Sequence, residues 1–323
     1  MTDIAMIEAA AQRLSGHARI TPLLNAPLLD RIAGRRVFVK AECLQWTGSF
    51  KYRGGWSAVS ALKPDQRARG VIAFSSGNHA QGVALAASQH GVPCVIIMPS
   101  DAPAVKINNT RAYGAEVVLY DRVSADRDAL GAEIATARGL TLIKPYDEPL
   151  VIAGQGTIGL EIAAQAADAG ITAATVITCC GGGGMTAGIA LALQARAPGF
   201  MVRPAEPAGF DDVARSLALG RIERNALLSG SVCDAIITPQ PGDITFPILK
   251  RLCGPGLVVS DDQALQAMAV AFTHLRIVLE PGGAVALAAA LFCKGLPETV
   301  ICTASGGNVD AAIFADALVR FGR

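Results

Sequence analysis

The sequence predicts an α/β protein with two open, twisted sheets flanked by helices. From Arg36 onward, short β-branched runs alternate with longer alanine-rich segments, a pattern typical of parallel strands joined by crossover helices. The chain has 323 residues, more than one hydrophobic core usually holds, which indicates two lobes. Hydrophobic residues make up 51% of the chain and charged residues 17%, so we expect a compact globular protein.

The elements follow from the spacing of apolar residues. An N-terminal helix is expected because apolar residues recur at helical spacing after a capping residue, either Thr2 or Asp3. In the first half we expect strands at 36–42, 71–76, 92–100, 115–120 and 140–145, separated by helices near 79–90, 103–113 and 124–138. In the second half we expect helices near 151–169, 185–195, 210–219, 262–275, 283–293 and 309–321, with strands at 175–180, 201–206 and 299–304.

Composition excludes several classes of function. The net charge of +1 and the lack of a Lys/Arg cluster argue against nucleic-acid binding. The longest apolar run, 284–293, is too short and too rich in alanine to cross a bilayer, and the N-terminus resembles neither a signal nor a transit peptide. The eight cysteines show no CxxC spacing and are interpreted as buried thiols. We therefore expect a soluble, cytoplasmic protein whose partners are small molecules or other copies of itself.

The segment GSFKYRGG (48–55) contains a candidate reactive amine, Lys51. Phe50 and Arg53 lie close to it in sequence, and in a site closed to water they are expected to favour the neutral, nucleophilic form. The alternative is an ordinary solvated lysine at the start of a helix.

Polar residues follow the strand 71–76 at its carboxyl end. Ser75, Ser76, Asn78 and His79 surround Gly77 at a strand-to-helix turn, where backbone N–H groups and short polar side chains can bind a substrate carboxylate. Helix capping alone would also explain these residues.

Four consecutive glycines, Gly181 to Gly184, lie between a strand and a helix. Four glycines cost conformational entropy, so the position is expected to need converging backbone donors, as a phosphate at a helix N-terminus would. The segment is neither GxGxxG nor a nucleotide P-loop, which favours a monophosphate. A tight turn is the alternative, although it needs only one or two glycines.

A third polar segment, SGGNVD, follows the strand 299–304. Its residue Ser305 could donate a hydrogen bond to a heteroaromatic nitrogen, and helix capping explains it nearly as well. An amine, a carboxylate turn, a monophosphate loop and a hydroxyl are together what pyridoxal phosphate requires.

Seven segments in order, GSFKYRGG, SSGNHAQG, VIAGQGTIGLE, GGGGMTAGIA, AEP, LEPGGA and SGGNVD, resemble the fold type II pyridoxal-phosphate enzymes. The resemblance is to the serine/threonine dehydratase and serine racemase family and covers about residues 5 to 320. It implies a tryptophan synthase β-like fold with the cofactor between two domains. The large domain would contain 1–69 and 148–323, and the small, mobile substrate-binding domain 70–147. The boundary lies near 144–149, where two prolines and two carboxylates also indicate a hinge.

The resemblance also implies residue roles. Lys51 would hold the cofactor covalently and act as the base at Cα, and Ser76 would be the acid or base on the opposite face. The cofactor-binding residues would be Phe50, Lys51, Asn78, Gly181, Gly182, Gly183, Gly184, Met185 and Ser305. The substrate carboxylate would be bound by Ser75, Ser76, Asn78 and His79. A neutral serine at the ring nitrogen would leave that nitrogen largely unprotonated, which favours β-elimination.

A cation site is implied in RPAEPAGFDD. The ligands would be Glu206, the carbonyl oxygen of Phe210 and Asp212, and these oxygen donors suit Mg²⁺, with Ca²⁺ or Mn²⁺ as alternatives. Without the resemblance, the carboxylates would be interpreted as a solvated helix start.

Two residues depart from the family pattern. Tyr146 replaces an asparagine, and Ala235 replaces a glycine. The chain also ends without room for a regulatory domain, which favours a catabolic enzyme of amino acids.

We expect an ammonia-lyase that dehydrates a β-hydroxy α-amino acid: serine, threonine or, as the favoured choice, 3-hydroxyaspartate. Arg53, Arg127 and the polar turn are candidates for binding the second carboxylate of 3-hydroxyaspartate. The alternatives are an amino-acid racemase and an inactive binding protein. A homodimer is expected from the resemblance alone.

Overall fold

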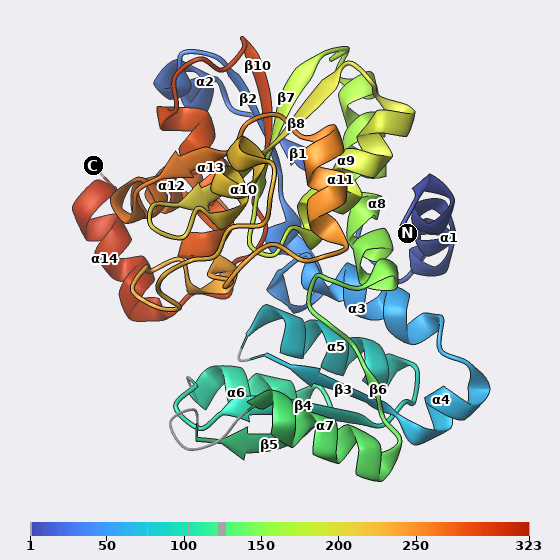
Figure 1. Cartoon of the computed structure of the whole chain (residues 1–323). Helices are drawn as coiled ribbons and strands as arrows, with labels where there is room; N and C mark the ends of the chain where they lie inside the picture. The colour runs from blue at the N-terminus through green and yellow to red at the C-terminus, as the bar shows by residue number, and fades with distance from the viewer. Residues whose placement is uncertain (1, 76, 103, 122–126, 323) are drawn as a thin grey trace.

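The computed structural model describes residues 2–75, 77–102, 104–121 and 127–322, and contains two sheets in two lobes (Figure 1). The large sheet has the order β1-β2-β10-β7-β8-β9 and the small sheet the order β5-β4-β3-β6. Their bounds are β1 (Leu23–Leu24), β2 (Arg36–Lys40), β3 (Val71–Phe74), β4 (Cys94–Pro99), β5 (Glu116–Tyr120), β6 (Thr141–Leu142), β7 (Ala174–Cys179), β8 (Phe200–Pro207), β9 (Leu257–Val259) and β10 (Thr299–Thr303). All pairings of named strands are parallel except that of β1 with β2. The predicted fold class is confirmed.

The helices cover both faces of the two sheets (Figure 1). They are α1 (Ile4–Leu14), α2 (Pro27–Ala33), α3 (Lys51–Ser60), α4 (Pro64–Arg69), α5 (Asn78–Gln89), α6 (Ala104–Ala112), α7 (Arg127–Arg138), α8 (Pro149–Asp168), α9 (Gly184–Arg196), α10 (Asp212–Leu219), α11 (Thr245–Leu252), α12 (Asp261–Leu275), α13 (Pro281–Phe292) and α14 (Ala311–Phe321). Short 3₁₀ helices are η1 (Glu42–Leu44), η2 (Trp46–Gly48) and η3 (Asp234–Ile236).

The first helix follows the predicted capping chemistry. Asp3 is the N-cap of α1, and its Oδ1 accepts a hydrogen bond from Met6 N at 2.9 Å. The buried residues of α1 are Ile7, Ala10 and Leu14, and this face packs against α8.

The short elements β1, β9, α2 and α11 are not predicted from the sequence, because segments of two to eight residues show too little periodicity to be identified.

The central strands are buried along their whole length. Every residue of β4 and of β7 is buried, as expected for parallel strands covered by helices on both faces. The chain enters the small sheet at β3 and leaves it at β6, and these strands pair at Val71 and Thr141. The small sheet is therefore connected to the large sheet by two neighbouring chain segments.

Helix α8 packs at the centre of the molecule against α9, α3 and α1. A Cβ on Gly188 of α9 would come within 2.5 Å of the Ile152 carbonyl oxygen of α8, so glycine permits the close contact. Among the described residues, α8 alone has the length and apolar composition of a membrane-spanning helix, but 61% of that stretch is buried inside the protein. A buried core helix passes the same test.

Candidate active site

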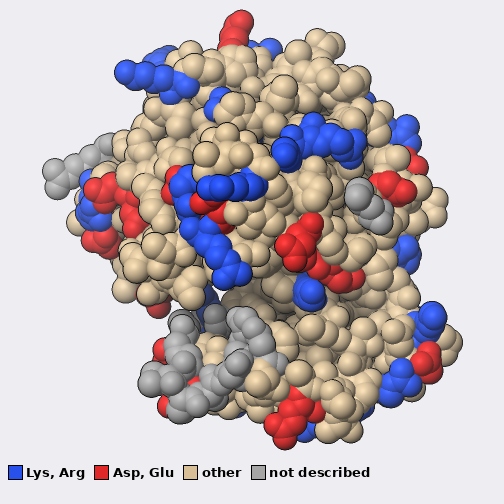
Figure 2. All heavy atoms as spheres, viewed as in Figure 1, with Lys and Arg blue, Asp and Glu red and all other residues tan. Residues whose placement is uncertain are grey.

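A cavity of about 190 Å³ lies between the two sheets, at the carboxyl ends of β3, β7 and β10. Figure 2 shows the surface hollowed where the two lobes meet. Its walls include most of the described residues predicted for the cofactor and the substrate: Phe50, Lys51, Ser75, Asn78, His79, Gly181, Gly182, Gly183, Gly184, Met185 and Ser305. Residues from four separate segments of the sequence thus meet in one site.

Lys51 is the first residue of α3, and its side chain lines this cavity. Its Nζ donates a hydrogen bond to the Pro145 carbonyl oxygen at 2.7 Å. Burial lowers the pKa of Lys51 to about 8. The Phe50 ring centre lies 5.1 Å from Nζ, and since a ring face attracts an ammonium, Phe50 opposes the loss of the proton. Burial, and not the predicted aromatic neighbour, is what favours the neutral amine.

Arg53 lies in a different environment from the one predicted. Its guanidinium is 1% exposed and forms ion pairs with Glu42 at 2.8 Å and Glu161 at 2.6 Å. It does not line the cavity and is not a cause of the lowered pKa of Lys51. The predictions that Arg53 activates Lys51 or binds a substrate carboxylate are therefore wrong.

The polar turn after β3 is held by contacts to both lobes. Asn78 Nδ2 donates to Glu280 Oε1 at 2.5 Å, and Asn78 Oδ1 accepts from Asn308 Nδ2 at 2.7 Å. Ser75 Oγ accepts a hydrogen bond from Gly77 N at 3.1 Å. Ser76 lies outside the described residues. An amide nitrogen carries two hydrogens, and Asn78 Nδ2 has one acceptor among the described residues, so its second hydrogen can be donated to a ligand.

His79 is buried beside this turn. Its Nε2 lies 2.9 Å from the Ile143 carbonyl oxygen, which requires the proton on Nε2. Burial, with a contribution from the Lys51 charge, lowers the pKa of His79 to about 3. The Nδ1 atom is buried and has no protein partner among the described residues. His79 is therefore a neutral side chain with a free acceptor facing the site.

The four glycines join β7 to α9, and neighbouring groups pack closely against each of them. A Cβ on Gly182 would come within 2.2 Å of the Tyr146 ring, and one on Gly184 within 2.8 Å of Gln155 Oε1. Gly183 has φ +91°, which disfavours any side chain. The Gly182 carbonyl oxygen accepts a hydrogen bond from Thr245 Oγ1 at 2.7 Å. The loop is therefore a fixed, side-chain-free wall at the start of a helix.

Ser305 follows β10 and is 3% exposed. Its carbonyl oxygen accepts a hydrogen bond from Phe50 N at 3.1 Å, so the serine and the reactive lysine segment are directly connected. Ser305 is one of the residues that line the cavity, where a partner for a ring nitrogen is expected.

Sequence reasoning assigns no role to Glu280, although the motif LEPGGA contains it. Glu280 is the N-cap residue of α13 and is 3% exposed. Burial raises the pKa of its carboxyl to about 7. Its Oε1 would lie 2.0 Å from a Cβ on Gly306, which explains the glycine there. Other lining residues that sequence reasoning missed are Phe74, Lys106, Gln155, Asp234 and Thr238.

The site fits pyridoxal phosphate. The glycine wall at the N-terminus of α9 offers backbone donors to a phosphate, and Lys51 and Ser305 face the same cavity. Three buried polar atoms in its wall, His79 Nδ1, Gln155 Oε1 and Thr238 Oγ1, have no protein partner among the described residues. Such atoms are costly unless a ligand or water satisfies them.

The predicted cation site lies at the end of β8. Glu206 accepts hydrogen bonds from Val213 N at 3.0 Å and Ala214 N at 2.7 Å. Asp212 Oδ1 accepts from Asn225 Nδ2 at 2.6 Å, and its buried Oδ2 has no protein partner among the described residues. Burial raises the pKa of Glu206 well above its ordinary value and that of Asp212 to about 7. Two buried carboxylates with a free oxygen fit a cation.

The predicted cation site has few side-chain ligands. Among the described residues, no three or more His, Cys, Asp or Glu side chains are grouped so that they could hold a metal ion, so carbonyl and water oxygens would have to complete the coordination. The side chain of Arg127, at the first residue of α7, lies outside what the structure describes, and its predicted contact with substrate stays a prediction.

Comparisons with known proteins agree with this geometry. A family model described as pyridoxal-phosphate dependent enzyme matches residues 14–307. L-threo-3-hydroxyaspartate ammonia-lyase of Pseudomonas sp is 41% identical over 313 residues, covering 96% of each chain. The crystal structure of a T.th. threonine deaminase has a TM-score of 0.90 and 43% identity, covering 95% of this chain and 99% of that one. Maize serine racemase has a TM-score of 0.91 and 33% identity, covering 99% and 97%.

Proposed function

The chain belongs to the pyridoxal-phosphate dependent enzymes of fold type II, and from this premise we propose that it is an ammonia-lyase acting on a β-hydroxy α-amino acid. The favoured substrate is 3-hydroxyaspartate, with threonine and serine as weaker ones. The observation that supports this class of reaction is the setting of Lys51. Its partly buried amine has a pKa lowered to about 8, and it shares one cavity with the glycine wall at the N-terminus of α9.

The residues that would hold the cofactor come from both lobes, with Asn78 at the start of α5 in the small-sheet lobe. The backbone of Gly181 to Met185 would bind the phosphate, Ser305 the ring nitrogen, and Asn78 an oxygen on the ring, while Lys51 would be the covalent attachment. Bound there, pyridoxal phosphate supplies an electron-withdrawing ring that stabilises negative charge at the substrate Cα.

Lys51 is the proton carrier of the proposed reaction. Its free amine would accept the proton from the substrate Cα. Burial makes this possible because it disfavours the ammonium form. The same Nζ can then return a proton to the hydroxyl that leaves Cβ as water. The product is released as an enamine, which tautomerises and is hydrolysed by water to a 2-oxo acid and ammonia.

The polar turn positions the substrate. Backbone N–H groups at the start of α5 and the side chains of Ser75 and Asn78 are suited to an α-carboxylate. His79 remains neutral because its pKa is about 3, so it can orient the turn through Ile143 without taking up the α-proton. The Asn78 contacts to Glu280 and Asn308 join this turn to the other lobe and limit its freedom.

We further propose a divalent cation, Mg²⁺ by preference, at Glu206, the Phe210 carbonyl oxygen and Asp212. The support is the buried Asp212 Oδ2, which has no partner in the part of the chain that the structure describes, beside a second buried carboxylate. A cation would neutralise both and stabilise the connection between β8 and α10. A cytoplasmic homodimer remains our expectation.

Amino-acid racemisation is the second candidate, because a serine racemase is among the relatives. It requires an acid on the face of Cα opposite Lys51, and the predicted one, Ser76, lies outside the described residues. Dehydration is favoured because the 41%-identical relative is a 3-hydroxyaspartate ammonia-lyase.

The test is a substrate panel with the cofactor-loaded enzyme. We expect kcat/KM for ammonia release to be at least about 10-fold higher with 3-hydroxyaspartate than with threonine or serine. Equal turnover of the three would contradict the substrate assignment, and racemised product without oxo acid would contradict dehydration. No reaction with any of them would favour a binding protein.

Chelation tests the cation in the same preparation. Removing divalent ions should lower the unfolding midpoint by about 5 °C, and Mg²⁺ should restore it. Asp212→Asn should no longer respond to Mg²⁺. An unchanged midpoint after chelation would argue against the proposed site.

A further inference from the structure

Lys106 connects the two lobes at the mouth of the cavity. It lies on α6 of the small-sheet lobe, and its Nζ is 3.5 Å from Oδ2 of Asp234, in η3 of the other lobe. The same Nζ lies 4.0 Å from the point that a Cβ on Gly77 would occupy, so the ammonium is beside the carboxylate-binding turn. The Lys106 side chain is only 18% exposed. A cation is thus held at the open end of the substrate site.

Positive charge is scarce in this cavity. Among the described residues that line it, Lys51 and Lys106 are the only ones with a side-chain ammonium, and there is no arginine. Lys51 is assigned to the cofactor and the α-proton. Lys106 is therefore the described cation left for a second anionic group on the substrate.

The pairing of Lys106 with Asp234 is weak enough to be exchanged. The Asp234 side chain is 67% exposed, and the atoms are 3.5 Å apart. Exposed pairs of this kind contribute little stability. A substrate carboxylate that enters the less exposed side of Lys106 can replace Asp234, with a stronger charge-assisted hydrogen bond as the result.

We propose that Lys106 binds the distal carboxylate of a dicarboxylic β-hydroxy amino acid and so determines substrate choice. This rests on the proposed function, and it assigns the specificity for 3-hydroxyaspartate to one side chain. Serine and threonine have no group for Lys106 to bind. A substrate carboxylate left without a cation in a closed site would be strongly disfavoured.

Asp234 and Glu280 complete the charge pattern around Lys106. Glu280 lines the same cavity, and the Lys106 charge lowers the pKa of its carboxyl, against the larger effect of burial. Asp234 carries negative charge at the entrance and repels a dicarboxylate until Lys106 is engaged. The Lys106–Asp234 ion pair would therefore select at the entrance for a dicarboxylate, whose distal carboxylate replaces Asp234 on Lys106.

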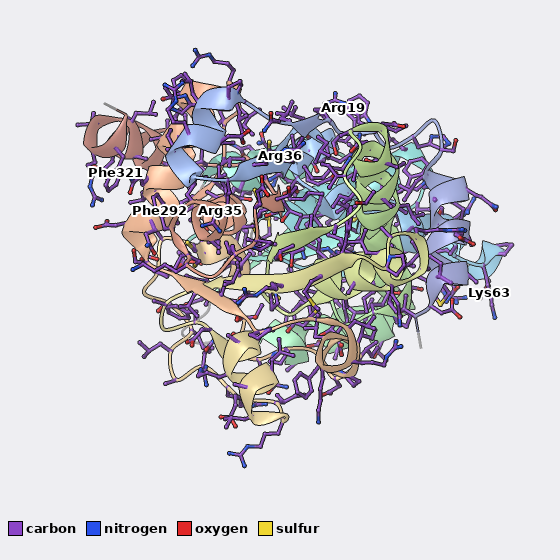
Figure 3. All side chains as sticks on the ribbon, turned by 90° about the horizontal axis from the view of Figure 1, so that it is seen from above. Arg19, Arg35, Arg36, Lys63, Phe292 and Phe321 are labelled. Carbon is purple, nitrogen blue, oxygen red and sulfur yellow. The ribbon has the colours of Figure 1, made fainter. Side chains whose placement is uncertain are left out.

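The first experiment compares substrates on the cofactor-loaded variant Lys106→Met. We expect kcat/KM for 3-hydroxyaspartate to fall about 10- to 100-fold, while the values for serine and threonine stay within about 3-fold. Lys106→Arg should recover part of the loss. The matched control is Lys63→Met, because Lys63 is exposed at the edge of the molecule (Figure 3) and is not among the residues that line the cavity.

The second experiment measures binding without turnover. Calorimetry should show that the cofactor-loaded wild type binds succinate, and that it binds butyrate at least about 10-fold more weakly. In Lys106→Met the two affinities should become equal. Asp234→Asn should bind succinate about 2- to 5-fold more tightly, since it removes both the competitor and the repulsion.

The outcomes are separable. If the wild type does not prefer 3-hydroxyaspartate, the proposed function fails first. If it does, and Lys106→Met keeps that preference and the preference for succinate, Lys106 is not the determinant. An equal loss with all three substrates would mean that Lys106 binds the α-carboxylate or only holds the lobes together, and it would also overturn the proposal.

Discussion

Lys40 and Lys51 are both largely removed from solvent, and they differ in whether a carboxylate lies beside the amine. Lys40, at the end of β2, is 0% exposed and donates to Glu161 at 2.5 Å and to the Thr21 carbonyl oxygen at 2.6 Å. Lys51, later in the chain, has only the neutral Pro145 carbonyl oxygen as its hydrogen-bond acceptor among the described residues.

The difference is the presence of a carboxylate. Burial lowers the pKa of Lys40, and the charges of Glu161 and Glu42 oppose that shift. Burial lowers the pKa of Lys51 to about 8, and no carboxylate among the described residues opposes that shift. The first region is a structural ion network that also contains Arg53, and the second is a reactive site. Burial makes a lysine a nucleophile only where no counter-ion accompanies it.

The largest expected effect comes from breaking the reactive side of this comparison. Lys51→Ala should reduce ammonia release at least about 10⁴-fold, because it removes both the covalent attachment and the base. The free energy of unfolding should change by less than about 1 kcal/mol, since no buried charge loses its partner. Ammonia assays, the visible absorption of bound cofactor and urea unfolding measure the three consequences. Retained activity would remove Lys51 from the mechanism.

Breaking the ion network around Arg53 should instead lower the free energy of unfolding strongly. Arg53→Met leaves the 0%-exposed Glu42 without its ion-pair partner and should reduce the free energy of unfolding by about 3–5 kcal/mol. Arg69→Met removes an exposed pair with Asp65 and is the control, with an expected loss below about 1 kcal/mol. Urea unfolding compares the two variants. Similar losses for both would mean that burial does not distinguish these ion pairs.

The smallest effect sharpens the comparison without a mutation. In the cofactor-free protein, amine acetylation of Lys51 should rise about tenfold per pH unit and level off above about pH 8, because only the neutral amine reacts. N-acetyl-lysine amide in the same tube should keep rising to about pH 10.4. Lys40, measured in the same digest by mass spectrometry, should remain unlabelled. Equal labelling of Lys40 and Lys51 would contradict the role given to the counter-ion.

The sequence predicted the parts of this site that have a local pattern. Four adjacent glycines are expensive to order, and the structure shows a close contact at each, so the glycine wall is recognisable from residues 181–184 alone. Lys51 is identified by its neighbours, yet the interpretation of Arg53 is wrong. Lys51 and Arg53 are two residues apart on α3, and side chains at that spacing point to different sides of a helix. Proximity in sequence therefore does not mean that they are in contact.

Other residues could not be found from the sequence by any local rule. Glu280 meets Asn78 across 202 positions of the chain, and Lys106 meets Asp234 across the gap between two lobes. A single glutamate before a proline or a single lysine on a helix is ordinary, and its function arises only when the sheets come together. The strands β1 and β9 were missed because they are short and their pairing is set by neighbours.

The contact between Tyr146 and Gly182 has a consequence for how this sequence can change over evolutionary time. A methyl group at position 182 would lie 2.2 Å from the tyrosine ring, so a mutation there is blocked as long as the ring is present. A smaller residue at 146 would have to arise first, and an alanine at 182 would then make a return to tyrosine equally costly. The order of substitutions at positions 146 and 182 is therefore constrained, and once both have changed, position 146 cannot return to tyrosine without a clash unless position 182 returns to glycine first.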